Sequence, residues 1–586
     1  MASDRVYGVT PPLSLTLPTE AEKRCSDALI EELRRQKTFE SPSDTEKRYK
    51  VLESLQHICN EFVKRVAKAR EPKNDILIKN ARGKVFTYGS FRLGVFGPGS
   101  DIDTLIVAPK YVTRDDYFEH FPKMLVDMAP EGAITDLTVV TDAFVPIIKF
   151  EYSGISIDLI FSRIIQKQLS PDFQDLKDSS LLRGLDEAEL RSLNGTRVTD
   201  EILHLVPEQS TFKLALRAIK LWAQRRAVYA NIMGFPGGVA WAMLVARVCQ
   251  LYPKAATAVI VNKFFLIISQ WRWPQPVLLK PIESGPLPVR VWNPKAYKGD
   301  SFHLMPVITP AYPSMCATFN ITRSSMTIIN QELQRGLEIT EAIMVGKRPW
   351  SDLFVKHTFF TADYRYYISV TTASKDKEAH KVWSGYVESK VRMLVQKLET
   401  HQSIDLARAF NKGYDRRHLC KNDEEIAQVQ EGCLDYLMKP DDEVPTPAAA
   451  ATPAPETDAD KPVEESKEAD GAAKPASPTV VYTTTHYIGL QLHKDAKALD
   501  LSYQVDEFKS LCTHWKKYEE ELKSLVSIGI QHVRNSNLPD DLFEPGETKP
   551  QKKSAKGALN GKKRAQPEDN TQPPAKRQQA SVVAAG

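Results

Sequence analysis

The chain has 586 residues, more than one hydrophobic core normally organises, so we expect several domains. Its 42% hydrophobic and 26% charged residues are typical of soluble globular proteins, and a formal net charge of +4 is too small to indicate a partner. The 7 cysteines are scattered without a Cys-x-x-Cys pair, which argues against a disulfide framework or a zinc site. We predict no membrane span, because the most apolar stretch, residues 259–268, is too short, and no signal peptide, because the first residues lack an apolar core.

Two amphipathic helices are predicted near the N-terminus. Thr19 and Glu22 have the spacing of a capping box, and a helix should follow to about residue 36. A second box, Ser43 with Glu46, should open a longer helix. Its apolar residues recur at helical spacing at Val51, Leu52, Leu55, Ile58, Cys59, Phe62, Val63 and Val66.

Residues 86–109 contain the motif with the clearest chemical meaning. The pair Gly89–Ser90 is followed, after a glycine-rich passage, by Asp101 and Asp103 at the head of an apolar run that predicts a strand. Alternation along a strand puts both carboxylates on one face, where a hard cation such as Mg²⁺ would relieve their repulsion. Flexible glycine backbone and the Ser90 hydroxyl could hold a phosphate. The alternative is a polar strand end beside a glycine-rich turn.

The region 75–165 is predicted as strands alternating with one helix. The expected elements are a strand at 75–78, a helix at 117–128, a strand at 137–140, and a hairpin with arms 145–152 and 155–161. In the second arm Asp158 falls on the face opposite the apolar residues, and a lone buried aspartate is costly without a partner. We interpret Asp158 as the third ligand of the Asp101–Asp103 site; the alternative is a satisfied polar residue at a sheet edge.

Long helices are predicted from about residue 211. On the helix at 212–226, Lys213, Arg217 and Lys220 align on one stripe, which indicates either a phosphate-facing surface or a solvated basic face. A glycine-punctuated turn within 229–241 leads into a second helix, whose N-terminus would favour an anion. We expect a pocket opposite the aspartates, and a further helix at 328–345.

The C-terminal third is predicted as an α+β sandwich similar to an RNA-recognition domain. Its expected elements are strands at 359–370, 404–410 and 480–490 and helices at 386–398 and 505–518. The stretch Tyr364–Tyr367 could stack bases or pack in the core. Residues 440–478 are too polar and proline-rich to bury a core and should be a disordered insertion. The basic clusters of 541–586 indicate a nuclear-localisation signal, a nonspecific RNA-binding arm or simply a solvated tail.

These residues together resemble a known family. Gly89–Ser90, Asp101 with Asp103, and Asp158 within 154–160 are similar to the signature of DNA polymerase β-type nucleotidyltransferases. The segments 218–229, 234–241 and 312–318 extend the resemblance to the eukaryotic nuclear poly(A) polymerase family, most closely its fungal form, over about residues 5–535. Tyr88, where Phe is usual, and Phe96, where relatives carry a polar or basic residue, depart from the pattern and leave a loop contact open.

The resemblance implies an α+β multidomain protein, with the nucleotide in the cleft between a mixed-sheet catalytic domain and a helical middle domain. The implied parts are an N-terminal helical segment 1–60 packing on the middle domain, a nucleotidyltransferase domain 61–205, a helical middle domain 206–351, an RNA-recognition-like domain 352–540 interrupted by 440–478, and a basic tail 541–586.

The resemblance also implies roles for individual residues. Asp101, Asp103 and Asp158 would be catalytic and hold two Mg²⁺, or Mn²⁺, ions. Lys220 and Tyr229 would contact the phosphates and sugar of ATP, and Asn231, Gly238 and Val239 the adenine. The full implied ATP site is Tyr88, Gly89, Ser90, Ser100, Asp101, Ile102, Asp103, Asp158, Lys220, Tyr229, Asn231, Gly238 and Val239. Val145 and Met315 would lie near the terminal RNA base.

The implied activity is addition of AMP from ATP to RNA 3′ ends by a two-metal in-line displacement that releases pyrophosphate. The implied setting is mRNA 3′ processing in the nucleus, by a monomer that works with cleavage and polyadenylation factors. Two alternatives remain at this point. A uridylyl- or CCA-adding transferase shares the Gly-Ser and Asp-x-Asp core, and an RNA-binding scaffold could carry an inactive transferase domain.

Overall fold

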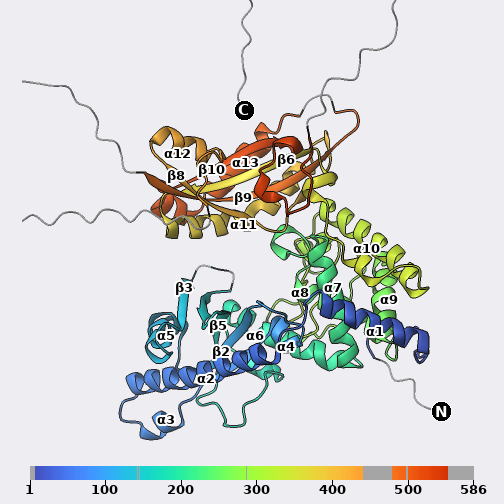
Figure 1. The fold of residues 1–586 in the computed structure, drawn as a ribbon. Helices are drawn as coiled ribbons and strands as arrows, with labels where there is room; N and C mark the ends of the chain where they lie inside the picture. The colour runs from blue at the N-terminus through green and yellow to red at the C-terminus, as the bar shows by residue number, and fades with distance from the viewer. Residues whose placement is uncertain are drawn as a thin grey trace, which may run out of the picture. The chain divides into compact units, whose positions relative to one another are not determined.

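The computed structural model describes residues 7–141, 143, 145–285, 287–439, 478–496 and 499–551. The chain divides into two compact units, Met1–His357 and Thr358–Gly586, and each is described by itself. Figure 1 shows the elements of both. No helix among the described residues is long and apolar enough to cross a membrane. The predicted disordered insertion, except Pro478, and the basic tail beyond residue 551 lie outside the described residues.

The two N-terminal helices form where amphipathic spacing predicts them. α1 (Glu20–Arg35) begins with the predicted capping box of Thr19 and Glu22, and it packs against α9 (Thr257–Ser269) of the middle region. α2 (Pro42–Arg70) begins earlier than predicted, because Ser41, not Ser43, is its N-cap and accepts the Asp44 N–H. Pro42 explains the difference, since its fixed φ and missing N–H suit the first helical turn.

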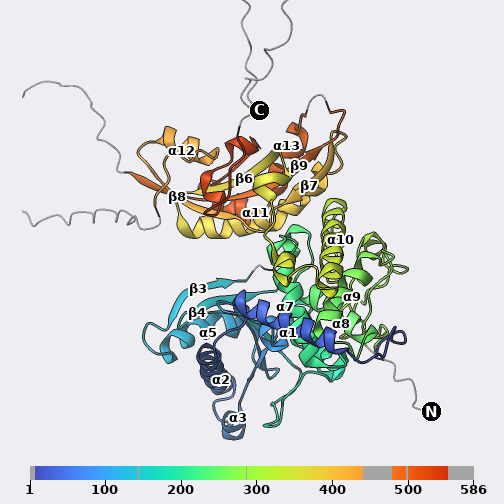
Figure 2. The same ribbon diagram turned by 45° about the vertical axis from the view of Figure 1, so that its right-hand side comes forward.

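The helix α2 also changes the predicted division of the N-terminal part. It runs without a break through residue 60 and packs against α5 (Arg114–Met128) and β1 (Lys84–Thr87). Residues 1–60 are therefore not one packing segment: α1 lies on the middle helices, and α2 covers the first sheet (Figure 2).

The first sheet is mixed and has the strand order β1-β2-β5-β4-β3. Its other strands are β2 (Ile102–Ala108), β3 (Ile134–Val140), β4 (Ile147–Tyr152) and β5 (Ile155–Arg163). β2 and β5 are parallel, and the other pairs are antiparallel. The hairpin turning at Ser153 and Gly154 is confirmed.

One predicted strand is wrong and one strand was missed. Residues 75–78 begin the helix α3 (Asp75–Asn80), because the Asn74 side chain accepts the Leu77 N–H and so caps a helical turn. The neighbouring strand β1 was not predicted, since Lys84–Thr87 is only four residues long.

Two helical layers enclose the first sheet. On one face, α2 and α5 form a core with the sheet that includes Phe62, Tyr117 and Ile157. On the other face, α6 (Glu187–Leu205) contributes Leu193 to a cluster with Leu105 and Ile160. Alternation along the strands places Asp103 and Asp158 on this second face.

The middle region is helical, as predicted. It consists of α7 (Gln209–Arg225), α8 (Gly238–Leu251), α9 and α10 (Arg323–Met344), the last beginning five residues before its predicted start. The aromatic centre joins α7 to α9, with the Trp222 and Phe265 rings 4.9 Å apart, edge to face. Such packing fixes how α7 presents its other side, which faces the first sheet.

The second unit is an antiparallel sheet with helices, as predicted for an RNA-recognition-like sandwich. The strand order is β10-β6-β9-β7, and β8 also pairs with β9. The strands are β6 (Tyr366–Ser374), β7 (Ile404–Ala409), β8 (Tyr414–Cys420), β9 (Thr479–Leu492) and β10 (Val526–Arg534). The helices are α11 (Lys377–Leu398), α12 (Asp423–Gln430) and α13 (Ser502–Thr513). β8, β10 and α12 were not predicted.

The predicted strand at 359–370 is only partly correct. Phe359–Asp363 forms a single helical turn, and β6 begins at Tyr366. The buried Tyr367 donates from its hydroxyl to the Phe359 carbonyl at 2.6 Å, and Tyr364 is also buried. Core packing is therefore the correct interpretation of these two tyrosines. Past the predicted domain end at 540, the second unit still includes Asp541, which pairs with Arg416 at 2.7 Å.

Candidate active site

Strand pairing brings the three predicted aspartates together. Parallel pairing of β2 with β5 sets Asp103 directly beside Asp158, and Asp101 lies one residue before β2. Each of the three carboxylates offers an oxygen within 4.8 Å of the others. Three hard oxygen donors at this spacing suit a divalent cation.

The crowding of three carboxylates changes the electrostatics of the triad, most clearly the pKa of Asp103. Burial, together with the neighbouring charges of Asp101 and Asp158, raises the pKa of Asp103 to about 7. The ammonium groups of Lys149 and Lys220 oppose this shift. The nearby positive groups do not fully balance the negative charges of the triad. A cation bound among these carboxylates would therefore be strongly stabilised.

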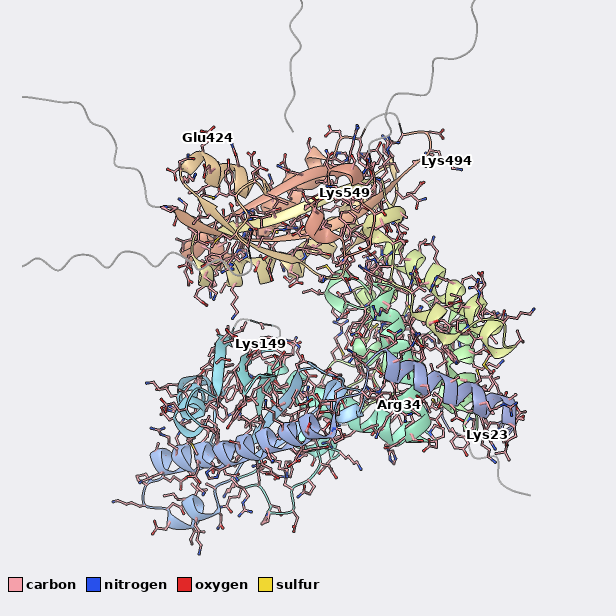
Figure 3. The ribbon with its side chains drawn as sticks, in the orientation of Figure 1. Lys23, Arg34, Lys149, Glu424, Lys494 and Lys549 are labelled. Carbon is pink, nitrogen blue, oxygen red and sulfur yellow. The ribbon has the colours of Figure 1, made fainter. Side chains whose placement is uncertain are left out.

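Lys149 belongs to this site but was missed from the sequence. It lies in β4 opposite Asp158, and Figure 3 labels it. Its Nζ is 2.6 Å from Asp158 Oδ2. The hairpin contained the signal: a two-residue turn pairs Tyr152 with Ile155, and counting three residues back along one arm and three on along the other pairs Lys149 with Asp158.

Gly89 is held against the triad at the start of the short helix α4 (Gly89–Leu93). Its φ of +61° is accessible to glycine, and a Cβ there would lie 2.1 Å from Asp103 Oδ2. The preceding Tyr88 donates its N–H to the Asp103 carbonyl at 3.0 Å, and the ring of Tyr88 packs so closely on α6 that a Cβ at Gly195 would lie 3.0 Å from it. The Gly-Ser turn and the Asp-x-Asp strand therefore form one rigid unit.

Two residues of the basic stripe of α7, Lys220 and Arg217, have different surroundings. Lys220 is half-buried; burial and the nearby Arg217 lower its pKa, while Asp101 and Asp103 stabilise its charge. Arg217 instead donates to the Phe96 carbonyl at 2.8 Å and the Gly94 carbonyl at 3.2 Å. The solvated-face alternative is thus wrong for both residues: Lys220 faces the triad, and Arg217 joins α7 to the loop after α4.

Phe96, the departure left open by the sequence, is a packing residue. Its ring lies 4.8 Å from that of Phe91, and the Arg48 guanidinium lies over it at 5.4 Å. Arg48 is in turn paired with Glu40 at 2.8 Å, and both side chains are buried. An aromatic ring at position 96 therefore completes a buried cluster at the junction of α2 and α4.

Several residues predicted for the nucleotide lie at the start of α8. Burial, with the charges of Asp101 and Asp103, raises the pKa of Tyr229 to about 12, and a Cβ at Gly238 would lie 2.6 Å from the Tyr229 hydroxyl. Asn231 is exposed, and its carbonyl accepts from the buried Asn320 at 3.1 Å. Asn320 was not predicted, because nothing in the local pattern marks it.

The remaining predicted residues differ in what they can offer. Val239 and Met315 are each 40% exposed, whereas Val145 packs partly buried on the cluster that contains Leu105. The Ile102 side chain is fully buried in the core beneath α2 and α5, so only its backbone could meet a ligand. Ser90 is partly buried, and the Ser100 hydroxyl accepts the Gly97 N–H at 3.0 Å within its own loop.

Comparison with known proteins gives matches along nearly the whole chain. Family models match residues 8–206 (poly(A) polymerase nucleotidyltransferase domain), 211–356 (poly(A) polymerase central domain) and 358–552 (poly(A) polymerase predicted RNA binding domain). The poly(A) polymerase pla1 of Schizosaccharomyces pombe is 52% identical over 93% of this chain and 94% of its own length. Poly(A) polymerase PAPa of Candida albicans is 47% identical over 96% and 98%.

More distant proteins also match. The poly(A) polymerase of Dictyostelium discoideum is 37% identical over 95% of this chain and 62% of its own length. A solved structure of Cid1, described as an RNA terminal uridylyl transferase, covers 57% of this chain and 99% of its own, with 12% identity and a TM-score of 0.39. With all three family models matched and fungal relatives about half identical over nearly their full length, the chain belongs to the poly(A) polymerase family.

Proposed function

We propose that this protein transfers AMP from ATP to the 3′ hydroxyl of RNA by in-line displacement, and so builds poly(A) tails on mRNA. In the reaction the RNA 3′ oxygen bonds to the α-phosphorus of ATP, the bond from that phosphorus to the β-phosphate oxygen breaks, and pyrophosphate leaves. The observation that carries the proposal is the convergence of Asp101, Asp103 and Asp158 on one face of the sheet, with Lys220 of α7 beside them.

The donor set of the triad fits two Mg²⁺ or Mn²⁺ ions. Asp101 and Asp103 would hold both ions, and Asp158 the one nearest the RNA 3′ end. Carboxylate oxygens are the ligands these hard cations prefer. Burial and the charges of Asp101 and Asp158 raise the pKa of Asp103, and a bound cation would favour the charged form of that carboxylate. When bound, the ions would stabilise the negative charge that develops on the transferring phosphoryl group.

The residues of the chain itself would position the reactants. We propose that Lys220 and Tyr229 hold the phosphates and sugar of ATP, and that Asp158 accepts the hydroxyl proton. The Gly-Ser turn of Gly89 and Ser90 would carry the triphosphate close to the triad, supported by Tyr88, Ser100 and the backbone of Ile102.

Base recognition would come from the exposed surface at the start of α8. Asn231, Gly238 and Val239 would contact adenine, and the exposed side chain of Val239 offers an apolar contact for a base. Met315, also exposed, and Val145 would lie near the terminal RNA base. The carbonyl of Asn231 is fixed by Asn320, so this edge of the site is preorganised.

The division of labour along the chain follows the same proposal. We assign catalysis to residues 61–205 together with the part of α2 before residue 61, and closure over the nucleotide to the helical region 206–351. RNA binding is assigned to residues 352 to about 551, most of which lie in the second unit. We further propose that the protein is a nuclear monomer recruited by cleavage and polyadenylation factors, since its relatives are named poly(A) polymerases. Localising a fluorescent fusion with and without residues 552–586 tests the role of the basic tail.

A primer-extension assay tests the activity. An RNA primer offered each of the four nucleotides in turn should be extended with ATP and at most weakly with the others. Preferred extension with UTP or CTP would contradict adenylyl transfer and favour the other transferase classes.

The Asp158→Ala variant tests the catalytic triad and the inactive-scaffold alternative together. It should keep its fold by circular dichroism and its RNA affinity, but lose AMP addition. Retained addition by this variant would contradict the assignment of Asp158, and inactivity of the unaltered protein with every nucleotide and either metal would favour the scaffold.

A further inference from the structure

Strand pairing sets three charged residues side by side across three strands of the first sheet. Asp103 in β2 pairs with Asp158 in β5, and Asp158 pairs with Lys149 in β4. Lys149 Nζ lies 2.6 Å from Asp158 Oδ2. Among the described residues, no ammonium or guanidinium group makes a comparable ion pair with the other two carboxylates. The lysine therefore neutralises one carboxylate of the triad, that of Asp158.

An ammonium group and a divalent cation compete at this carboxylate. Mg²⁺ binds carboxylate oxygens at about 2.0 to 2.1 Å, so an ion that shared Asp158 would sit next to the positive charge of Lys149. The two cations repel each other, and the lysine is the one that can leave, since its side chain is 51% exposed and its stem can turn toward water.

We propose that Lys149 is a positioning residue that acts as a displaceable countercharge of the metal site. It holds the Asp158 carboxylate in place and relieves repulsion within the empty triad. It also weakens the binding of the metal ion that uses Asp158, relative to the ion held by Asp101 and Asp103 without Asp158. This inference rests on the proposed function, because it presupposes that the triad holds divalent cations.

Binding of Mn²⁺ to the full chain without nucleotide or RNA tests this role independently of activity. Free Mn²⁺ is followed by electron paramagnetic resonance during a titration. Lys149→Met keeps the length of the side chain and removes its charge, and it should tighten Mn²⁺ binding about fivefold, the upper range for one partly exposed ion pair. The matched control is Lys79→Met, which removes one exposed lysine from α3 and should change Mn²⁺ affinity far less.

A double-mutant cycle separates displacement from a general change in charge. In an Asp158→Asn background the carboxylate that pairs with Lys149 is absent. Adding Lys149→Met should then affect Mn²⁺ binding no more than Lys79→Met does. Equal tightening in both backgrounds would overturn the proposal, and so would no tightening in the parent chain. If the parent chain bound no Mn²⁺, the metal site of the proposed function would itself be contradicted. This outcome differs from the two that contradict only the role of Lys149.

Thermal unfolding without metal provides a second readout. Removing the countercharge should leave the three carboxylates repelling one another, so Lys149→Met should have a lower melting temperature than Lys79→Met. Adding Mn²⁺ should remove this difference in melting temperature. Equal melting temperatures of Lys149→Met and Lys79→Met in metal-free buffer would contradict the proposal that Lys149 stabilises the empty triad.

Discussion

The two sheets of this protein bury polar groups in opposite ways. In the first, Asp101, Asp103 and Asp158 gather on one face with their oxygens within 4.8 Å. In the second, buried histidines hydrogen-bond to the strand β9: His418 Nε2, in β8, lies 3.0 Å from Thr483 Oγ1, and His380 Nε2, in α11, lies 2.9 Å from Thr484 Oγ1.

Burial shifts the Asp103 carboxyl and the histidines toward their neutral forms, but the surroundings of the two kinds of group differ. It raises the pKa of Asp103 to about 7 and lowers the pKa values of His418 and His486 to about 4. His418 and His380 meet threonine hydroxyls of β9, whereas Asp103 lies beside two further carboxylates. A crowded set of like charges therefore indicates a ligand site, and neutral groups with internal partners indicate structure.

The largest expected effect is the loss of activity when a triad charge is removed. Asp103→Asn should lower AMP addition by about 10³-fold or more, because the charge stabilisation supplied by a metal site is lost. It should not lower the melting temperature of the metal-free protein, since a repelled charge disappears. Single-turnover primer extension and thermal unfolding check both expectations. Asp127→Asn, at an exposed position on α5, is the control and should retain activity.

Crowding at the Gly-Ser turn predicts the next effect. Gly89→Ala puts a Cβ where Asp103 Oδ2 now lies and forces a positive φ on alanine, so we expect about a 10²-fold loss of activity and about 1 to 2 kcal/mol of stability. Gly385→Ala is the matched control: this glycine lies within α11 with open space around it, and alanine should stabilise by up to about 1 kcal/mol. Equal behaviour of the two variants would contradict the close approach at Gly89.

Lys220 separates nucleotide binding from RNA binding. Lys220→Ala should raise the ATP concentration needed for half-maximal rate by about thirtyfold, the value of a charge-assisted hydrogen bond to phosphate, and leave RNA affinity unchanged. Steady-state kinetics measure the ATP requirement, and a filter-binding assay measures the RNA affinity. An unchanged ATP requirement would contradict the proposed contact between Lys220 and the phosphates of ATP.

The buried histidines predict a pH dependence of stability in the second sheet. Their pKa values are lowered in the folded state, so the unfolded chain takes up protons first as the pH falls below about 6.5, and folding weakens until about pH 4. Between pH 7 and pH 5 we expect a loss of about 1 to 2 kcal/mol for His418, which is 1% exposed. Urea unfolding of the full chain and of His418→Gln at both pH values checks this, and the variant should lose less. Equal losses would exclude His418 as the cause.

Much of the fold followed from local patterns. The capping box of Thr19 and Glu22, the hairpin around Ser153 and Gly154, and the Asp-x-Asp strand each depend on residues a few positions apart. Such patterns act before any tertiary contact forms. Two of the failures have a local explanation: the four residues of β1 carry too little periodicity, and at 75–78 a capping side chain outweighed apolar composition.

The sequence by itself determined the chemistry of this protein: the two aspartates on one strand face, the third on the next, and the family to which they belong. Only the tertiary structure decided which other groups meet them. Arg217 and Lys220 lie three positions apart on one helix stripe, yet one binds carbonyls and the other faces the triad. Asn320 reaches Asn231 across 89 positions. Periodicity specifies which face a residue occupies, but its neighbours come from distant segments, and their packing sets its role.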